Sequence, residues 1–329
     1  MINPYFAPTY MRMLYRFLRL PKDQEHRLFA GTDVTAVQLM QAEHGIAFDD
    51  QMQICRNALT LSKPGLGLRM GRQLQLAAHG ALGTAMQNAA DLNQALETFG
   101  RFGATRASFF QLDKTINKQH CHLMLRTEHL SDELSIFFTE SILGTIDHTL
   151  TFYTGSDEAD KTICFNYPAP SYAAEYKNTF RTSVTFDAKE TRLRFPKAYL
   201  QLSTYEADQD VFTDSIHRCR LELAQQSELR GLKSTLEQFL KNNPGKLWGV
   251  DEVAAELSMS PRTLMRRLRE QNTTYQQIRD NVVQSQAKQY LRTMTVTATA
   301  TALGFADESS FRRTFKRWFG VPPLTYRGT

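Results

Sequence analysis

Residues 295–319 read TVTATATALGFADESSFRRTFKRWF. The run predicts a short helix near residues 296–303, a turn at Gly304 and a second helix near residues 307–318. Apolar residues recur at helical spacing along one side of the second helix: Phe311, Phe315 and Trp318 or Phe319. The other side is polar: Glu308, Ser309, Arg312, Arg313 and Lys316. Two short helices joined by a tight turn are typical of a helix-turn-helix unit.

The same pattern precedes it in VDEVAAELSMSPRTLMRRLREQ, residues 250–271. Asp251 is expected to cap a helix over residues 252–257. A three-residue turn follows and ends at Ser260, which is expected to cap the next helix. Pro261 then takes the first helical position, where a missing backbone N–H has no cost.

The second helix of this earlier pair has two distinct sides. Leu264 and Leu268 lie four residues apart and predict its buried side. Its exposed side consists of Arg262, Thr263, Met265, Arg266 and Arg269, and the arginines there are strong hydrogen-bond donors. An arginine can donate two hydrogen bonds to guanine O6 and N7, or bind a phosphate. This helix is therefore a candidate recognition helix for the major groove of double-stranded DNA.

The two helix-turn-helix patterns together make a more specific prediction than either pattern alone. The two outer helices begin about 47 residues apart, and a long helix near residues 276–292 joins them. Two recognition helices on one rigid body are suited to successive major grooves, about 34 Å apart on one face of DNA. The fold class expected for residues 229–329 is therefore an all-α domain of two helix-turn-helix units joined by a long helix.

The charge distribution divides the chain at a similar place. The whole chain of 329 residues carries a net charge of +5. Residues 230–329 hold 16 basic and 8 acidic residues, a net of +8, so residues 1–229 hold 23 and 26, a net of −3. A basic segment attached to an acidic one is typical of a nucleic-acid-binding module. An ordinary solvated surface explains the same numbers.

Residues 1–228 predict an α+β domain with an antiparallel sheet. Residues 106–127 predict a β-hairpin, and residues 131–153 return to a helical period. Short strands are expected within residues 161–167 and residues 181–195. Hairpin-connected strands between helices favour α+β over a parallel doubly wound sheet.

Several segments of this domain leave more than one interpretation open. GLGLRMGRQLQ (residues 65–75) is rich in glycine but has no P-loop lysine, and turns are the better interpretation. Residues 206–226 predict a helix whose apolar stripe is either a dimer seam or an internal packing face. The stripe consists of Phe212, Ile216, Cys219 and Leu223. Clustered phenylalanines near residues 109–110 and 137–138 are either an effector pocket or ordinary core.

No catalytic or cofactor motif appears. The cysteines lie far apart, and no C-x-x-C is present. His120 and His122 share a strand face from which Cys121 points away, so a metal site is not expected. No G-x-S-x-G occurs, and the chain is not expected to be an enzyme. It has no 18-residue apolar run and no signal-like N-terminus, which predicts a cytoplasmic protein without a membrane partner.

Two stretches of the C-terminal domain resemble the AraC/XylS family of bacterial transcriptional regulators. They are LSMSPRTLMRRLRE (257–270) and ALGFADESSFRRTFKRWFGVPPLTYR (302–327). Residues 1–228 resemble the arabinose-binding type of domain found in the ornithine- and arginine-responsive subgroup of that family. The matching stretches are GLGLRMGRQLQLAAHGALGTAM (65–86), YAAEYKNTFRTSVTFDA (172–188) and LRFPKAYL (193–200).

The resemblance implies a role for each matching position. It implies that Arg262, Met265 and Arg266 of the first recognition helix face bases, with Arg266 the foremost. In the second it implies base contacts by Glu308, Ser309, Ser310 and Arg313, and phosphate or solvent contacts by Arg312, Lys316 and Arg317. Thr299 departs from the family, which usually has a branched aliphatic residue there, and TVTATATA is a weak helix by propensity.

The resemblance also implies a function for the whole chain. It implies a sequence-specific regulator, more often an activator, that binds DNA and RNA polymerase, senses a small molecule and forms a homodimer. No effector-binding residue is identified. The alternative is an effector-free architectural protein that binds DNA with little sequence preference.

Overall fold

The computed structural model describes residues 4–41, 46–128, 130–271 and 273–327. The chain forms two compact units, here called the N-terminal unit, which ends at Cys219, and the C-terminal unit, which begins at Arg220. The division lies inside a helix, α10 (Gln209–Arg230), whereas the sequence predicted a domain boundary after residue 228.

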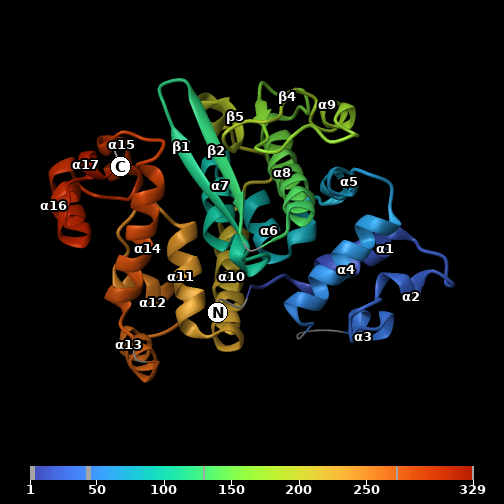
Figure 1. The fold of residues 1–329 in the computed structure, drawn as a ribbon, viewed down its shortest axis with the longest axis horizontal. Helices are drawn as coiled ribbons and strands as arrows, with labels where there is room; N and C mark the ends of the chain where they lie inside the picture. Colours follow the sequence, from blue (N-terminus) through green and yellow to red (C-terminus); the bar gives the residue numbers. More distant parts are fainter. Residues whose placement is uncertain (1–3, 42–45, 129, 272, 328–329) are drawn as a thin grey trace. The chain divides into compact units, whose positions relative to one another are not determined.

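The N-terminal unit combines helices with one five-stranded sheet (Figure 1). Its α-helices before α10 are α1 (Pro8–Leu18), α2 (Glu25–Leu28), α3 (Ala36–Gln41), α4 (Phe48–Leu61), α5 (Leu66–Gln73), α6 (Ala81–Gln87), α7 (Leu92–Phe102), α8 (Asp132–Thr154) and α9 (Ala174–Phe180). The short 3₁₀ helices are η1 (Leu76–His79), η2 (Gly103–Thr105) and η3 (Lys197–Gln201). The strands are β1 (Phe110–Ile116), β2 (His120–Thr127), β3 (Thr162–Cys164), β4 (Ser183–Thr185) and β5 (Thr191–Pro196).

The sheet has the strand order β1-β2-β5-β3-β4. β1 and β2 form the predicted hairpin, with Leu112 opposite Leu125, and β5 pairs antiparallel with both β2 and β3. The strands β3 and β4 pair parallel, which differs from the expected all-antiparallel sheet. The reason is connectivity, because α9 lies between them in the chain and a crossover returns β4 in the same direction.

Helix α8 packs against β2 and, closely, against α5. The prediction of turns for residues 65–75 was wrong, because most of this stretch, residues 66–73, forms α5. Its glycines provide close helix contact. A Cβ at Gly67 would lie 2.3 Å from Glu140, and one at Gly71 would lie 3.2 Å from the Cα of Gly144. The glycines that resembled a loop therefore serve helix packing.

A buried carboxylate strengthens this contact. Glu140 on α8 accepts a hydrogen bond from the Leu68 backbone N–H (3.1 Å), and others from the hydroxyls of Tyr172 (2.9 Å) and Tyr176. Burial raises the pKa of Glu140 to about 7, although the three hydrogen bonds oppose that shift. Glu140 thus ties α5, α8 and the α9 region together.

Helix α10 carries the apolar stripe that the sequence interpreted as either a seam or a packing face. Ile216 and Cys219 are buried in the core of the N-terminal unit, with Phe212 packed against it, and Leu223 is buried in a core of the C-terminal unit. The apolar stripe therefore packs against other residues of the same chain.

After α10, the described residues of the C-terminal unit form helices and connecting turns without strands, as expected. Its helices are α11 (Leu232–Asn242), α12 (Val250–Glu256), α13 (Pro261–Glu270), α14 (Tyr275–Tyr290), α15 (Val296–Ala302), α16 (Glu308–Phe319) and α17 (Pro323–Arg327). They enclose two hydrophobic cores, and α14 contributes to both. Its Ile278 and Val282 belong to the first core, and its Val283 and Ala287 to the second.

Across the described ranges, no helix combines the length and apolarity needed to cross a lipid bilayer.

Candidate nucleic-acid interface

Helices α12 and α13 form the first helix-turn-helix. Val253 and Ala254 bury one side of α12. The prediction that Asp251 caps this helix was wrong. The helix begins at Val250, two residues before the predicted start, and its N-cap is Gly249, whose backbone N–H donates to the Glu252 carboxylate at 2.8 Å. A glutamate three residues after the cap supplies this bond, so Asp251 lies in the first turn.

The start of α13 follows the prediction closely. The Ser260 hydroxyl accepts a hydrogen bond from the Thr263 backbone N–H at 3.1 Å, and Pro261 is the first helical residue. Leu264 and Leu268 are fully buried. The cap and the two leucines fix the rotation of α13 about its axis, so that its other side faces outward.

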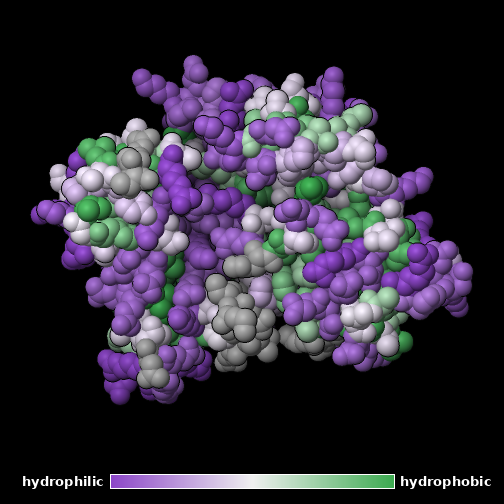
Figure 2. Space-filling view, viewed as in Figure 1, coloured by the Kyte–Doolittle hydropathy of each residue, from purple (hydrophilic) through white to green (hydrophobic). Residues whose placement is uncertain are grey.

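The outward side of α13 carries most of the predicted contact residues. Arg262, Met265, Arg266 and Arg269 are exposed, and the surface over α13 is mostly hydrophilic in Figure 2. Arg266 forms an ion pair with Glu270, with Nη1 and Oε1 2.6 Å apart, and both side chains remain largely exposed. Thr263 is only half-buried and its hydroxyl contacts Ser260 at 2.8 Å, so it is part of the cap.

Helices α15 and α16 form the second helix-turn-helix. The Asp307 carboxylate caps α16 by accepting from the Ser310 backbone N–H at 2.7 Å. This hydrogen bond lowers the pKa of Asp307, because it stabilises the charged carboxylate. Phe311 and Phe315 are fully buried, and Phe305 contacts Phe311 edge to face at 5.2 Å between ring centroids. The aromatic side predicted from the sequence is thus the core of this unit.

The outward side of α16 is divided between exposed and engaged residues. Ser309, Arg313 and Lys316 are exposed. Glu308 is half-buried, accepts a hydrogen bond from the Thr297 hydroxyl of α15, and pairs with Arg312. These partners lower the pKa of Glu308. Ser310 is also half-buried, and its hydroxyl donates to Asp307 at 3.1 Å. The predicted residues therefore lie on one helix, but Glu308, Ser310 and Arg312 already form hydrogen bonds or ion pairs within this unit.

Two contacts of α11 and the loop after it, one with α14 and one with the turn of the second helix-turn-helix unit, were not predicted from the sequence. The Gln286 side chain of α14 donates to the Lys241 carbonyl of α11 at 3.1 Å. Gly304 (φ 79°) lies against the loop between α11 and α12, where a Cβ on it would be 2.5 Å from the Lys246 Cα. The glycine in the family signature is visible in the sequence, but its contact partner Lys246 lies 58 positions earlier.

Comparisons with known proteins agree with this architecture. Residues 24–204 match the model of the arabinose-binding N-terminal domain of AraC transcription regulators, and residues 253–329 match a helix-turn-helix domain.

The chain is also similar to whole regulators. The ornithine utilization regulator of Pseudomonas aeruginosa is 30% identical over 86% of this chain and 84% of its own length. An uncharacterized helix-turn-helix regulator of Mycobacterium tuberculosis is 25% identical over 91% of this chain and 89% of its own. The crystal structure of the regulator CdpR from P. aeruginosa covers 98% of this chain and 97% of its own, at 18% identity and a TM-score of 0.44. The chain belongs to the AraC family of helix-turn-helix transcription regulators.

Proposed function

We propose that this regulator is a ligand-responsive, sequence-specific activator that works in the cytoplasm as a homodimer. In this proposal α13 and α16 bind adjacent major grooves, and a small molecule in the N-terminal unit alters the affinity for DNA or RNA polymerase. Such a response requires a different effector affinity in the active and inactive states.

The observation that carries the proposal is the outward side of α13. Arg262, Arg266 and Arg269 are exposed on one short helix that is held in a fixed rotation by its buried leucines. An exposed arginine can donate to a base edge or to a phosphate. We assign base contacts to Arg262, Met265 and Arg266 in α13.

In α16 we assign base contacts to Glu308, Ser309, Ser310 and Arg313. For Glu308 and Ser310 this assignment requires their present hydrogen bonds to Thr297 and Asp307 to rearrange on DNA. Arg312, Lys316 and Arg317 are assigned to phosphate or solvent.

The experiment compares Arg266→Ala with Arg279→Ala on selected operators. Both variants remove one positive charge, but Arg279 is half-buried on α14, where it pairs with Asp280. Fluorescence anisotropy on operators with single base changes should show that Arg266→Ala loses about 1–3 kcal/mol at one position and relaxes preference there. Arg279→Ala should leave base preference unchanged.

Two results would change the assignment. Equal weakening of Arg266→Ala on every sequence makes Arg266 a phosphate contact. A steep salt dependence without any sequence preference in the unaltered chain favours the architectural alternative. Transcription from a reporter operator, with and without effector, then separates activation from repression.

A further inference from the structure

One apolar side chain interrupts the hydrophilic outward side of α13. Met265 is 40% exposed and lies between Arg262 and Arg269 along the helix. Together with Arg266 these residues occupy positions i, i+3, i+4 and i+7, which share one side of a helix. The other members of this stripe are arginines, so Met265 is the member that cannot donate a hydrogen bond.

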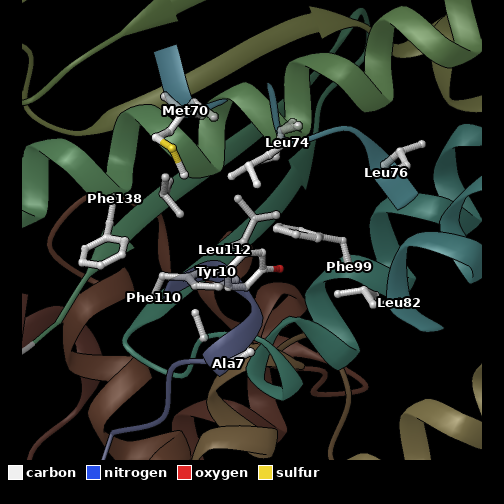
Figure 3. Packing of buried hydrophobic residues seen from close by; sticks show 14 of the residues in the cluster. Ala7, Tyr10, Met70, Leu74, Leu76, Leu82, Phe99, Phe110, Leu112 and Phe138 are labelled. Carbon is white, nitrogen blue, oxygen red and sulfur yellow. The ribbon is translucent and has the colours of Figure 1, made fainter. Parts of the chain in front are cut away.

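Packing within the chain does not account for this methionine. Met259 packs against the first core of the C-terminal unit and Met294 against the second, whereas, among the described residues, Met265 joins neither core. A methionine that serves packing is enclosed. Figure 3 shows Met70 among the buried side chains of the N-terminal unit, where it is only 4% exposed. Met265 therefore has its apolar surface free for a partner outside the chain.

The outward sides of the two candidate recognition helices differ in this respect. The exposed residues on the outward side of α16 are hydrogen-bond donors: Ser309, Arg313 and Lys316. Within the described part of residues 248–320, Met265 is the one large apolar side chain that is exposed. The first helix therefore offers DNA an apolar group that the second does not.

The chemistry of the major groove limits what an exposed methionine can recognise. Base edges present hydrogen-bond donors and acceptors there, and the C5 methyl group of thymine is the apolar group among them. A thioether sulfur is only a weak acceptor, so it gains little from the polar edges. Contact with a thymine methyl group removes apolar surface of both partners from water. Thymine is therefore the base that suits Met265 best.

We infer that Met265 is a specificity-determining residue, and that it recognises the C5 methyl group of one thymine in the operator. This assignment rests on the proposed function, in which the outward side of α13 enters the major groove. It adds the base, and the chemical group on that base, which position 265 contacts.

The adjacency of Met265 and Arg266 indicates where this thymine lies. Consecutive Cα atoms are about 3.8 Å apart and stacked base pairs about 3.4 Å apart, so neighbouring residues contact base pairs roughly one or two steps apart. The thymine should therefore lie within about two base pairs of the position at which Arg266→Ala relaxes preference. It can belong to either strand, because both strands present their methyl groups in the major groove.

The test replaces each thymine of an operator, selected from random-sequence DNA, with deoxyuridine. Uracil pairs as thymine does and lacks only the C5 methyl group. Fluorescence anisotropy with the full-length protein should show about fourfold weaker binding at one such position, because one methyl-sized group is no longer buried. Equal affinity for thymine and uracil throughout the segment bound by α13, or an operator without thymine in that segment, would overturn the assignment.

Two variants of Met265 locate the methyl contact. Leucine is apolar, glutamine is polar and similar in length to methionine, and all three residues are good helix formers, so both variants should fold. Met265→Leu should keep a thymine-to-uracil preference of at least about twofold. Met265→Gln should reduce this preference to about onefold. An unchanged preference in Met265→Gln would assign the methyl contact to a different side chain and contradict the inference.

Leu247 provides a matched control. It is 38% exposed, close to the value for Met265, but it lies in the loop between α11 and α12. Leu247→Gln makes a similar apolar-to-polar change outside both candidate recognition helices, so the thymine-to-uracil preference should stay at about fourfold. A loss equal to that of Met265→Gln would show that the preference does not depend on α13.

A modified cytosine provides the converse experiment. When the sensitive T·A pair is replaced by C·G, a 5-methyl group on that cytosine returns an apolar group to the same place in the groove. The unaltered chain should bind the methylated operator about fourfold more tightly than the unmethylated one, and Met265→Gln should bind both equally. No gain from methylation in the unaltered chain would argue against recognition of a methyl group.

Sequence preference on the same oligonucleotides separates this assignment from the proposed function. Sequence-specific binding without any difference between thymine and uracil overturns the role of Met265 and leaves the proposed function intact. Binding without any sequence preference contradicts the proposed function itself.

Discussion

The two helix-turn-helix units share a turn geometry but differ at its left-handed residue. Ser258 (φ 53°) holds this position in the first unit and Gly304 (φ 79°) in the second. In both, the next backbone N–H returns to the first helix, from Met259 to Ala254 at 2.8 Å and from Phe305 to Ala300 at 3.0 Å. A side chain is therefore compatible with the turn itself. Glycine is needed in the second unit because the Lys246 backbone approaches it.

Their cores also differ. The difference lies in the second helix of each unit, because α13 buries Leu264 and Leu268 whereas α16 buries Phe311 and Phe315. Aromatic rings bury more area per residue, so the loss of one ring from α16 should have the larger local effect.

The largest effect is expected from Phe315→Ala. Removing this buried ring should cost about 3–5 kcal/mol, against about 2–5 kcal/mol for Leu268→Ala in the first unit. Hydrogen-exchange mass spectrometry on the full chain should show faster exchange mainly in α15 and α16 for Phe315→Ala, and mainly in α12 and α13 for Leu268→Ala. If each variant accelerates exchange equally in both regions, the two cores form one cooperative unit and the comparison fails.

The next effect concerns the left-handed glycine. Gly304→Ala should destabilise the C-terminal unit by about 2–4 kcal/mol, from left-handed strain and from overlap with Lys246. Gly320→Ala is the matched control, because Gly320 has φ 75° but a Cβ there meets nothing within 4 Å. It should cost only about 1 kcal/mol in denaturant unfolding. Equal losses of stability in the two variants would mean that the loop around Lys246 shifts to accommodate the added methyl group without cost.

Local patterns in the sequence predicted much of the fold. The hairpin, α8 and both helix-turn-helix units followed from periodicity and capping residues. The helix α5 was missed because Gly67 and Gly71 resemble loop residues unless α8 is known to pack on them. The parallel pairing of β3 with β4 was missed because it depends on a crossover.

The residues of the candidate sites also differ in how far the sequence predicts them. The outward residues of α13 follow from helical spacing alone. The close approach of the Lys246 backbone to Gly304 joins segments far apart in the chain, and the Thr297–Glu308 hydrogen bond joins two successive helices. No spacing rule brings such residues together, so these features needed the structure.

A smaller effect is expected from Thr299→Val. Thr299 is fully buried in α15, and its hydroxyl has no hydrogen-bond partner in the described part of the chain. Valine has nearly the same shape and removes an unsatisfied polar group, so the variant should be about 1 kcal/mol more stable. Thr301→Val, at an exposed position of the same helix, should stay within about 0.5 kcal/mol. A destabilised Thr299→Val would imply that a buried water satisfies the hydroxyl.

The smallest effect is expected from replacing either of two acidic residues that each pair with an arginine four positions away. Glu270 pairs with Arg266 in the first unit, and Glu308 pairs with Arg312 in the second. Changing either to glutamine removes a negative charge near the proposed DNA surface. Each variant should bind non-specific DNA roughly twofold more tightly at low salt, since exposed charge interactions are weak and screened.

Glu308 should differ from Glu270 in one further respect. It also accepts the Thr297 hydroxyl, and this bond joins α15 to α16. Glu308→Gln should therefore slightly lower the unfolding midpoint and quicken exchange in α15, whereas Glu270→Gln should leave both unchanged. Anisotropy across a salt series, together with exchange measurements, checks the two variants side by side. If both variants behave alike in stability, the negative charge of Glu308 adds nothing measurable to its bond with Thr297, because a glutamine oxygen can still accept from that hydroxyl.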